Sequence, residues 1–98
     1  MPYAIKTTDK PGHEPLRLKL REEHLAYLDS QKDLLLAAGA LLSDDGKHAS
    51  GGLLLVDTED RAAAQRFIDN DPFTKNGLFS AVTIERWRKA YFDKKRLI

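Results

Sequence analysis

The sequence contains no cysteine in its 98 residues. Disulfide bonds, thiolate metal sites and a cysteine nucleophile are therefore excluded. No apolar run approaches the roughly 18 residues that a helix needs to span a bilayer. The N-terminal segment MPYAIKTTDK also lacks the long apolar stretch of a signal peptide. We therefore expect no membrane partner and a cytoplasmic location.

The sequence also lacks a strong net charge, since 16 basic and 15 acidic residues give a formal net charge of +1. Residues 86–98 nevertheless hold six of the basic residues and one acidic residue, together with Trp87, Tyr91 and Phe92. Basic residues interleaved with aromatic ones can bind nucleic acid through phosphate contacts and base stacking. Because the whole chain is almost neutral, we instead expect this segment to pack on its own domain or on a partner subunit.

Several chemistry-bearing motifs are missing. Gly51-Gly52 is not followed by Gly-Lys-Ser/Thr, and a predicted strand rather than a helix comes next, which argues against a phosphate-binding loop. Gly-x-Ser-x-Gly, the motif of a serine nucleophile on a tight turn, does not occur. His13 and His48 lie in predicted loops, and no pair of histidines has the spacing of metal ligands. We therefore expect neither a metal ion nor a cofactor.

The composition that remains is typical of a folded domain, with 42% hydrophobic and 32% charged residues. The length predicts one domain over residues 1–98, in which residues 88–98 form a C-terminal tail extension. Pro2–Thr7 is predicted to be a strand, because it is rich in β-forming residues and is followed by proline and glycine. After Pro15, apolar positions recur at steps of three and four through Ala38, which predicts a helix that Gly39 ends in a left-handed conformation.

The rest of the chain adds two strands, a helix and a last strand. Two strands are predicted at Ala40–Ser43 and Gly51–Val56, then a helix at Thr58–Asn70 with Asp57 as its cap, then a strand at Leu78–Ile84 that continues toward Trp87. The order β-α-β-β-α-β is that of the ferredoxin-like α+β fold, a four-stranded antiparallel sheet with two helices on one face. The other face of the sheet has no cover from this chain, so we expect a homodimer.

The most informative residue is His24, which lies in the apolar stripe of the first predicted helix. Three interpretations are open: a core histidine bonded to a backbone carbonyl, a metal ligand, or a general acid or base. Arg21 lies one turn earlier on a similar side. It could hold an anionic oxygen of a substrate, or it could be a surface arginine paired with an acidic neighbour.

Asp71 is the best candidate for a partner of His24. It also has a simpler interpretation, because an aspartate before proline often caps a short helical turn. Phe73, two residues later, is most simply a core residue. If the aspartate and the histidine meet, they form a small acid/base pocket.

A set of short motifs, in order along the chain, resembles the YCII family of YciI-like proteins from Tyr3 to about Trp87. The motifs are Arg21-x-x-His24-Leu25-x-Tyr27-Leu28, Gly51-Gly52, Ala62-Ala63, Asp71-Pro72-Phe73, Gly77-Leu78 and Trp87. The resemblance implies a ferredoxin-like domain that pairs sheet to sheet as a dimeric α/β barrel, in a superfamily with muconolactone isomerases and small monooxygenases. It also implies that His24 and Asp71 are the active-site pair.

These observations lead to a functional hypothesis. We expect a small cofactor-independent enzyme in which His24 moves a proton on a small organic acid or oxygenated ring, in lyase or isomerase chemistry. Asp71 would orient the histidine ring, and Arg21 and Phe73 would contact the small-molecule substrate. The alternatives are a non-catalytic dimer that binds a small regulatory ligand, and a structural dimer in which His24 is buried and inert.

Overall fold

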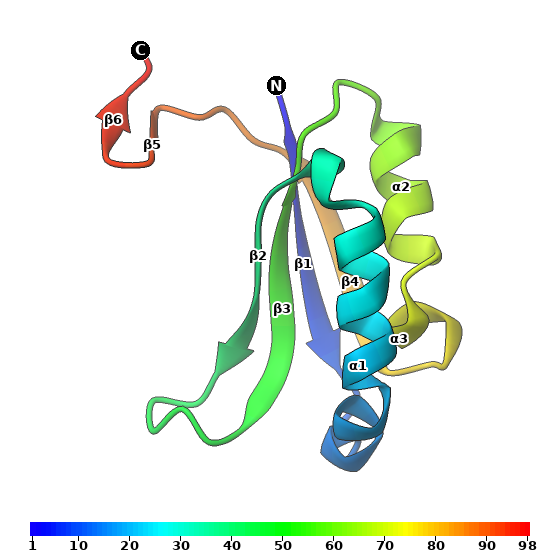
Figure 1. Ribbon diagram of the computed structural model, residues 1–98. Helices are drawn as coiled ribbons and strands as arrows, with labels where there is room; N and C mark the ends of the chain where they lie inside the picture. Colours follow the sequence, from blue (N-terminus) through cyan, green and yellow to red (C-terminus); the bar gives the residue numbers. More distant parts are fainter.

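The computed structural model describes all residues from 1 to 98 and has two layers, a four-stranded antiparallel sheet and helices that cover one of its faces (Figure 1). The strand order is β2-β3-β1-β4, which is that of the ferredoxin-like α+β fold. The predicted fold class is therefore confirmed. The elements are β1 (Tyr3–Asp9), α1 (Glu14–Ser30), a 3-10 turn η1 (Lys32–Leu34), β2 (Leu35–Leu42), β3 (Ala49–Val56), α2 (Arg61–Asp69), α3 (Pro72–Lys75), β4 (Phe79–Arg86), β5 (Tyr91–Phe92) and β6 (Lys95–Arg96).

Side chains alternate in direction along each strand, so one face of the sheet is buried and the other is open. In β1 the side chains of Tyr3, Ile5 and Thr7 are buried toward the helices, whereas Lys6 and Thr8 point the other way and are exposed. The core is built from these positions, their neighbours on β3 and β4, and the apolar side of α2. Its buried members are Tyr3, Ile5, Leu54, Val56, Ala64, Phe67, Ile68 and Ile84.

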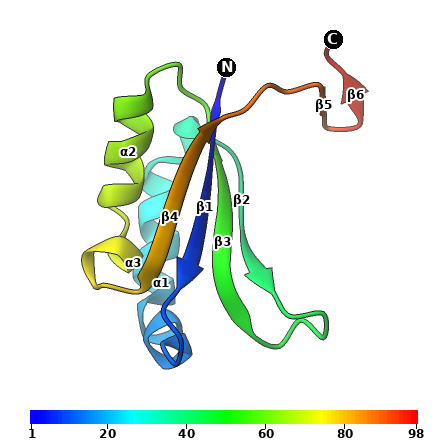
Figure 2. The same cartoon turned by 180° about the vertical axis from the view of Figure 1, so that it is seen from behind.

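The opposite side of the sheet, which we call the outer face, carries no helix (Figure 2). The pairing registers place on it Ala4, Lys6, Thr8, Ala37, Gly39, Leu41, Gly51, Leu53, Leu55, Ala81, Thr83 and Glu85. Gly51 lies where the backbone of β1 leaves no room for a side chain, because a Cβ there would collide with the carbonyl oxygen of Thr7. A glycine is therefore required at this point of the sheet.

The predicted first helix is too long. α1 ends at Ser30, and Leu35, Ala38 and Gly39 belong to β2. Gly39 therefore does not end a helix, and its backbone is not left-handed. β2 pairs with β3 from Leu35 opposite Val56 to Leu42 opposite Ala49. The pairing with β3 supplies hydrogen-bond partners for the backbone N–H and C=O groups of the apolar segment. The segment therefore forms a strand although its apolar residues are spaced as in a helix.

The later elements differ from prediction mainly at their ends. α2 begins after Asp60, whose side chain accepts a hydrogen bond from the backbone N–H of Ala62, so Asp60 is the cap rather than Asp57. Asp71 caps α3, a short helix for which Pro72 supplies the first residue. The simpler interpretation of Asp71 is therefore confirmed. None of the helices has both the length and the apolar character that crossing a membrane requires.

Candidate functional site

His24 lies in the middle of α1, with its ring directed at the start of α3. Its Nδ1 atom is 3.0 Å from Oδ1 and 2.9 Å from Oδ2 of Asp71, a residue 47 positions away in the sequence. The Asp71 side chain is fully buried, whereas 16% of the His24 side chain is exposed. The histidine therefore stands between a buried carboxylate and solvent.

Asp71 is held in place by its own element. As the cap of α3, its Oδ1 accepts a hydrogen bond of 2.9 Å from the backbone N–H of Phe73. Both carboxylate oxygens thus have partners, and no buried polar side-chain atom of the protein lacks one. The Asp71-Pro72-Phe73 step consequently holds the carboxylate through a contact that does not involve His24.

The contact also determines which nitrogen of the neutral His24 ring carries the proton. A carboxylate can only accept a hydrogen bond, so Nδ1–H donates to Asp71. Nε2 is then the unprotonated atom, and it has no partner within the protein. Because His24 also lines the cavity described below, its free nitrogen is available to a bound molecule.

Phe73 lies against the other side of the pair. Its ring stacks on that of His24, with 4.0 Å between centroids and 12° between the planes. The guanidinium of Arg17 also lies over the Phe73 ring, 4.7 Å from its centroid. Since Arg17 precedes His24 by seven residues, about 10 Å along a helix, the phenyl ring lies between the two.

Arg17 was not singled out from the sequence. It is buried, and its Nε and Nη2 atoms donate to the two carboxylate oxygens of Asp9 at 2.7 and 3.1 Å. A signal for it existed, because Arg17 lies on the same helical stripe as His24, two turns earlier. A charged residue on a buried stripe requires a partner, and that requirement could have led to Asp9.

A cavity of about 440 Å³ lies between α1 and the β2–β3 side of the sheet, with His24 in its wall. Ten of its nineteen lining residues are hydrophobic, which is typical of sites for small molecules. Its floor is made of small residues, Ala38 and Ala40 of β2 and Gly52 of β3, so the helix and the sheet do not close on each other.

The acidic side chains that line the cavity have partners within the protein, whereas two of the basic side chains do not. Glu14 accepts hydrogen bonds from the ring of His48 and from the backbone N–H of Ala49, both at 3.0 Å, and these bonds lower the pKa of Glu14. Asp71 is paired with His24. The charged lining residues that have no ion-pair partner are Arg21 and Lys47, and both are cations. The cavity therefore favours a negatively charged molecule.

Tyr27 lies one turn beyond His24 but does not join the pair. Its hydroxyl donates a hydrogen bond of 2.7 Å to the carbonyl of Phe67. Burial raises the pKa of Tyr27, and the negative charge of Asp71 raises it further. Tyr27 thus remains a neutral anchor between α1 and α2.

The structure therefore brings His24 and Asp71 into direct contact, as the sequence suggested, and it also stacks Phe73 on the histidine ring. Arg21 lines the same cavity but is exposed and does not touch the pair. No three side chains of His, Asp or Glu converge in the manner of a metal site. The other histidines are engaged elsewhere, His13 with the carbonyl of Pro11 and His48 with Glu14.

Comparisons with known proteins match this chain over nearly its whole length. The model of the YCII-related domain matches residues 1–88. The protein YciI of Escherichia coli O6:H1 is 30% identical over 98 aligned positions, covering 93% of this chain and all of the relative. An uncharacterised protein of Haemophilus influenzae is 29% identical with the same coverage.

Among solved structures, 5-chloro-2-hydroxyhydroquinone dehydrochlorinase from Burkholderia phenoliruptrix AC1100, in complex with 2,5-dihydroxybenzoquinone, is 36% identical with a TM-score of 0.83. The match covers 90% of this chain and 94% of that one. The protein Rv0793 of Mycobacterium tuberculosis is 20% identical with a TM-score of 0.52, covering 91% of this chain and 97% of that one. The second likeness concerns the fold alone.

Proposed function

This chain belongs to the YCII family, and we propose that it is a small enzyme that moves a proton on a small organic acid or oxygenated ring. The contact between His24 and the buried carboxylate of Asp71 is the observation that carries the proposal. His24 is the general base and acid, and Asp71 is its positioning partner. The chemistry is that of a lyase or isomerase, and it requires no cofactor.

The proposed reaction begins at Nε2 of His24. This atom takes a proton from a carbon next to a carbonyl group of the substrate, and the electron pair of the broken C–H bond becomes the C=C bond of an enolate, whose negative charge lies on the former carbonyl oxygen. The new imidazolium is stabilised by Asp71 through Nδ1–H. In a lyase reaction the enolate then expels a leaving group, and in an isomerase reaction His24 returns the proton to a different atom. A positioned acid/base group contributes a factor of roughly 10² to 10⁴ in rate.

The walls of the cavity support a flat, negatively charged substrate. Arg21 from α1 and Lys47 from the β2–β3 loop are the unpaired cations, and either can hold an anionic oxygen. Phe73 and the small-residue floor leave space suited to a single ring. The dehydrochlorinase that resembles this chain binds 2,5-dihydroxybenzoquinone, a ring of that size with ionisable oxygens, which supports an oxygenated ring as the substrate class.

We also propose that the protein is a homodimer formed through the outer face. Leu41, Leu53 and Leu55 lie on that face, and no helix of this chain covers them. Obligate homodimer interfaces bury roughly 2,000 Å² or more in total. A four-stranded sheet that packs on its own copy would remove this face from water.

The proposal is tested by following proton transfer directly. Small carboxylates, lactones and hydroxyquinones are screened by thermal shift, and those that bind are incubated with enzyme in D₂O while NMR follows exchange of their C–H protons. We expect His24→Gln to keep the fold but to lower the exchange rate by a factor of about 10² or more. His13→Gln, which changes a loop histidine outside the cavity, is the matched control and should exchange at the parent rate.

The outcomes separate the proposal from its alternatives. If exchange is unchanged in His24→Gln, His24 is not the base and the proposal is wrong. A ligand that binds the parent protein tightly with no exchange and no turnover would identify a binding or regulatory module instead. An inert core histidine would change only the stability of the protein, by about 1–3 kcal/mol.

A further inference from the structure

Residues 88–98, the tail, form a small hairpin whose side-chain contact with the preceding chain is the edge-to-face packing of Phe92 on Trp87, with 6.5 Å between ring centroids. β5 and β6 pair with each other over two residues each, Tyr91 opposite Arg96 and Phe92 opposite Lys95. No hydrogen bond or ion pair joins the tail to residues 1–86. The body holds only the residue before the tail, since the backbone N–H of Trp87 donates to the carbonyl of Pro2. The hairpin thus stands away from the body.

The turn of this hairpin is strained. Asp93 and Lys94 have φ angles of 51° and 63°, and they are the only residues other than glycine in the chain with positive φ. Asparagine and glycine are the usual residues of such a turn, because a side chain like that of lysine is disfavoured in the left-handed region. An isolated two-stranded hairpin is at best marginally stable in water. The contact with Trp87 is small, so packing against a second molecule would stabilise this hairpin further.

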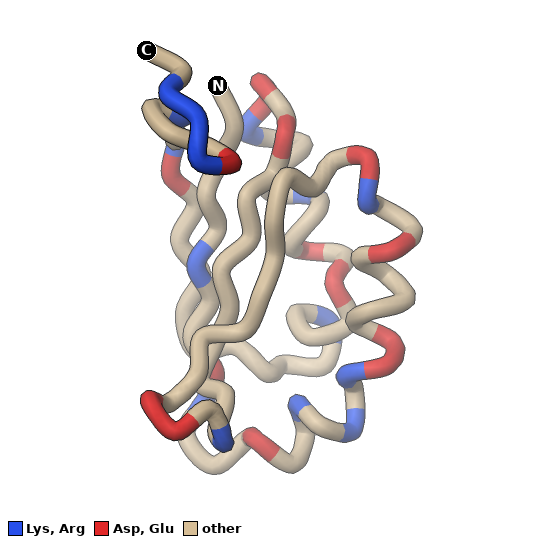
Figure 3. The backbone as a smooth tube through the Cα atoms, turned by 60° about the vertical axis from the view of Figure 1, so that its left-hand side comes forward, with Lys and Arg blue, Asp and Glu red and all other residues tan.

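The place of the tail indicates where those contacts come from. Viewed with the sheet edge-on, the helices lie on one side of the sheet and the tail lies on the other, above one end of the outer face (Figure 3). The segment after β4 leads the chain away from the body, so that β5 and β6 lie apart from the helices (Figure 1). A second copy seated on the outer face would therefore lie next to the tail.

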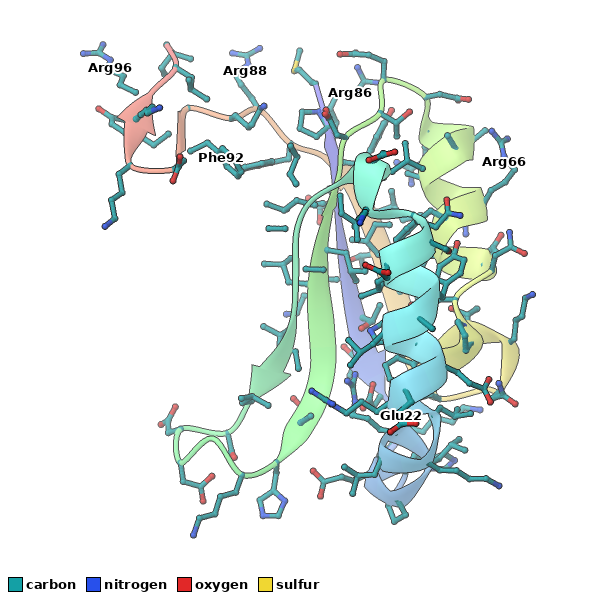
Figure 4. The ribbon with its side chains drawn as sticks, in the orientation of Figure 1. Glu22, Arg66, Arg86, Arg88, Phe92 and Arg96 are labelled. Atoms are coloured by element: carbon teal, nitrogen blue, oxygen red, sulfur yellow. The ribbon has the colours of Figure 1, made fainter.

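The chemistry of the tail fits such a partner. The tail has five basic residues and one acidic residue, whereas residues 1–87 have eleven basic and fourteen acidic residues. Arg88 and Arg96 extend away from the body (Figure 4), and neither makes an ion pair. Tyr91 and Ile98 are 64% and 67% exposed. A cationic arm with exposed apolar side chains complements the acidic body of another copy.

We propose that the tail is an arm that reaches across the dimer and packs on the body of the second copy. The inference rests on the homodimer described above and assigns the tail a role in it. The arm adds apolar contacts through Tyr91 and Ile98 and charge contacts through its lysines and arginines at the rim of the sheet-to-sheet interface. The strained turn is held by the partner rather than by its own chain.

The test reverses charge in the full-length protein. Lys94, Lys95 and Arg96 are changed together to glutamate, and sedimentation velocity measures the dissociation constant of the dimer at low and high salt. We expect the dissociation constant of the tail variant to be about tenfold higher than that of the parent at low salt, because each of the three exposed charges contributes a small part of the binding free energy. The difference between variant and parent should shrink at high salt, which screens these charges. The control changes Lys19, Lys32 and Lys75, three exposed lysines of the helical layer, to glutamate. It should leave the constant close to that of the parent.

The same measurements distinguish the arm from the dimer. A parent protein that sediments as a monomer would remove the homodimer and the arm together. A parent dimer whose dissociation constant is the same in the triple tail variant and the control would overturn the arm alone. Binding of a fluorescent single-stranded oligonucleotide, or of vesicles containing an anionic lipid, that the tail variant loses while its dimer is unaffected would also overturn it, because the tail would then serve a different partner.

Discussion

At the scale of single residues, Asp71 serves two elements at once. Its Oδ1 caps α3 through the backbone N–H of Phe73, and both of its oxygens face Nδ1 of His24. Removing the whole side chain would therefore disturb the helix and the histidine together. A substitution that keeps the cap and changes only the partner is needed to separate these effects.

Asp71→Asn is that substitution, because asparagine caps helices about as well as aspartate. We expect the fold to persist but the histidine to change its tautomer, since the asparagine amide can donate to Nδ1 and the ring proton then moves to Nε2. Proton exchange on a bound substrate should fall by a factor of about 10² to 10⁴. Long-range ¹H–¹⁵N NMR of the imidazole identifies the protonated nitrogen.

The control for this prediction is Asp69→Asn, which changes an exposed aspartate at the end of α2 that contacts Gln65. It should leave the His24 signals unchanged. If His24 carries its proton on the same nitrogen in the parent and in Asp71→Asn, the carboxylate does not set the tautomer.

The residues of the site differ in how well the sequence predicts them. His24 and Asp71 could be singled out, because a titratable ring on an apolar stripe requires a partner and the motifs of the family include both residues. Arg17 could not be recognised as readily, since its burial depends on Asp9 from a different element. Lys47 lies in a polar loop, and only the fold shows that this loop reaches the mouth of the cavity.

At the scale of elements, the least predictable boundary was that between α1 and β2. Leu34, Leu35 and Ala38 continue the spacing of the helix, yet the helix ends at Ser30. An apolar segment fits a buried helix or a strand equally well, and only pairing with a second strand decides between them. The cap of α2 shifted by three residues for a related reason, since Asp57 and Asp60 are both acceptable caps by sequence.

The contact between α1 and the β2–β3 loop should depend on pH through Glu14. Hydrogen bonds from His48 and Ala49 lower the pKa of Glu14 below its ordinary value of 4.5, and the charges of His48 and Arg17 act in the same direction. The folded state therefore binds the Glu14 proton less readily than the unfolded state. The stabilisation is complete above the ordinary value and is lost as pH falls through the lowered pKa.

The backbone amide of Ala49, which donates to Glu14, reports this loss. We expect its NMR chemical shift to titrate with a midpoint below 4.5, the ordinary value for glutamate, and the transition to disappear in Glu14→Gln. A midpoint at or above that value in the parent protein would show that the loop is not held through Glu14.

At the scale of the whole molecule, the proposed homodimer depends on the outer face. Leu53 lies at its centre on β3 and is 42% exposed in the single chain. Because the Leu53 side chain does not contribute to the core of its own chain, a substitution there should weaken the association of the two copies far more than it weakens the fold. The sequence predicted this open face from the element order alone, since two helices cover only one side of four strands.

Leu53→Glu should separate the dimer. A two-fold axis would bring two new carboxylates toward each other in a water-poor interface, and burying unpaired charge is costly. We expect the parent to sediment as a dimer at low micromolar concentration and the variant as a monomer with an unchanged circular dichroism spectrum. Ala26→Glu, on the exposed side of α1, should remain dimeric. A parent and a Leu53→Glu variant of equal mass would contradict an interface on this face.

The double use of Asp71 also has an evolutionary consequence. Codons for aspartate and asparagine differ by one base, and the exchange leaves the helix cap intact. On the roles proposed for His24 and Asp71, a lineage that carries this chain is therefore one mutation from a protein with the same fold and the same cavity, but with the proton of its histidine displaced to Nε2. If the proposed proton transfer holds, this single exchange separates an enzyme from a protein that binds the same ligand without turnover, and the reverse exchange is equally short.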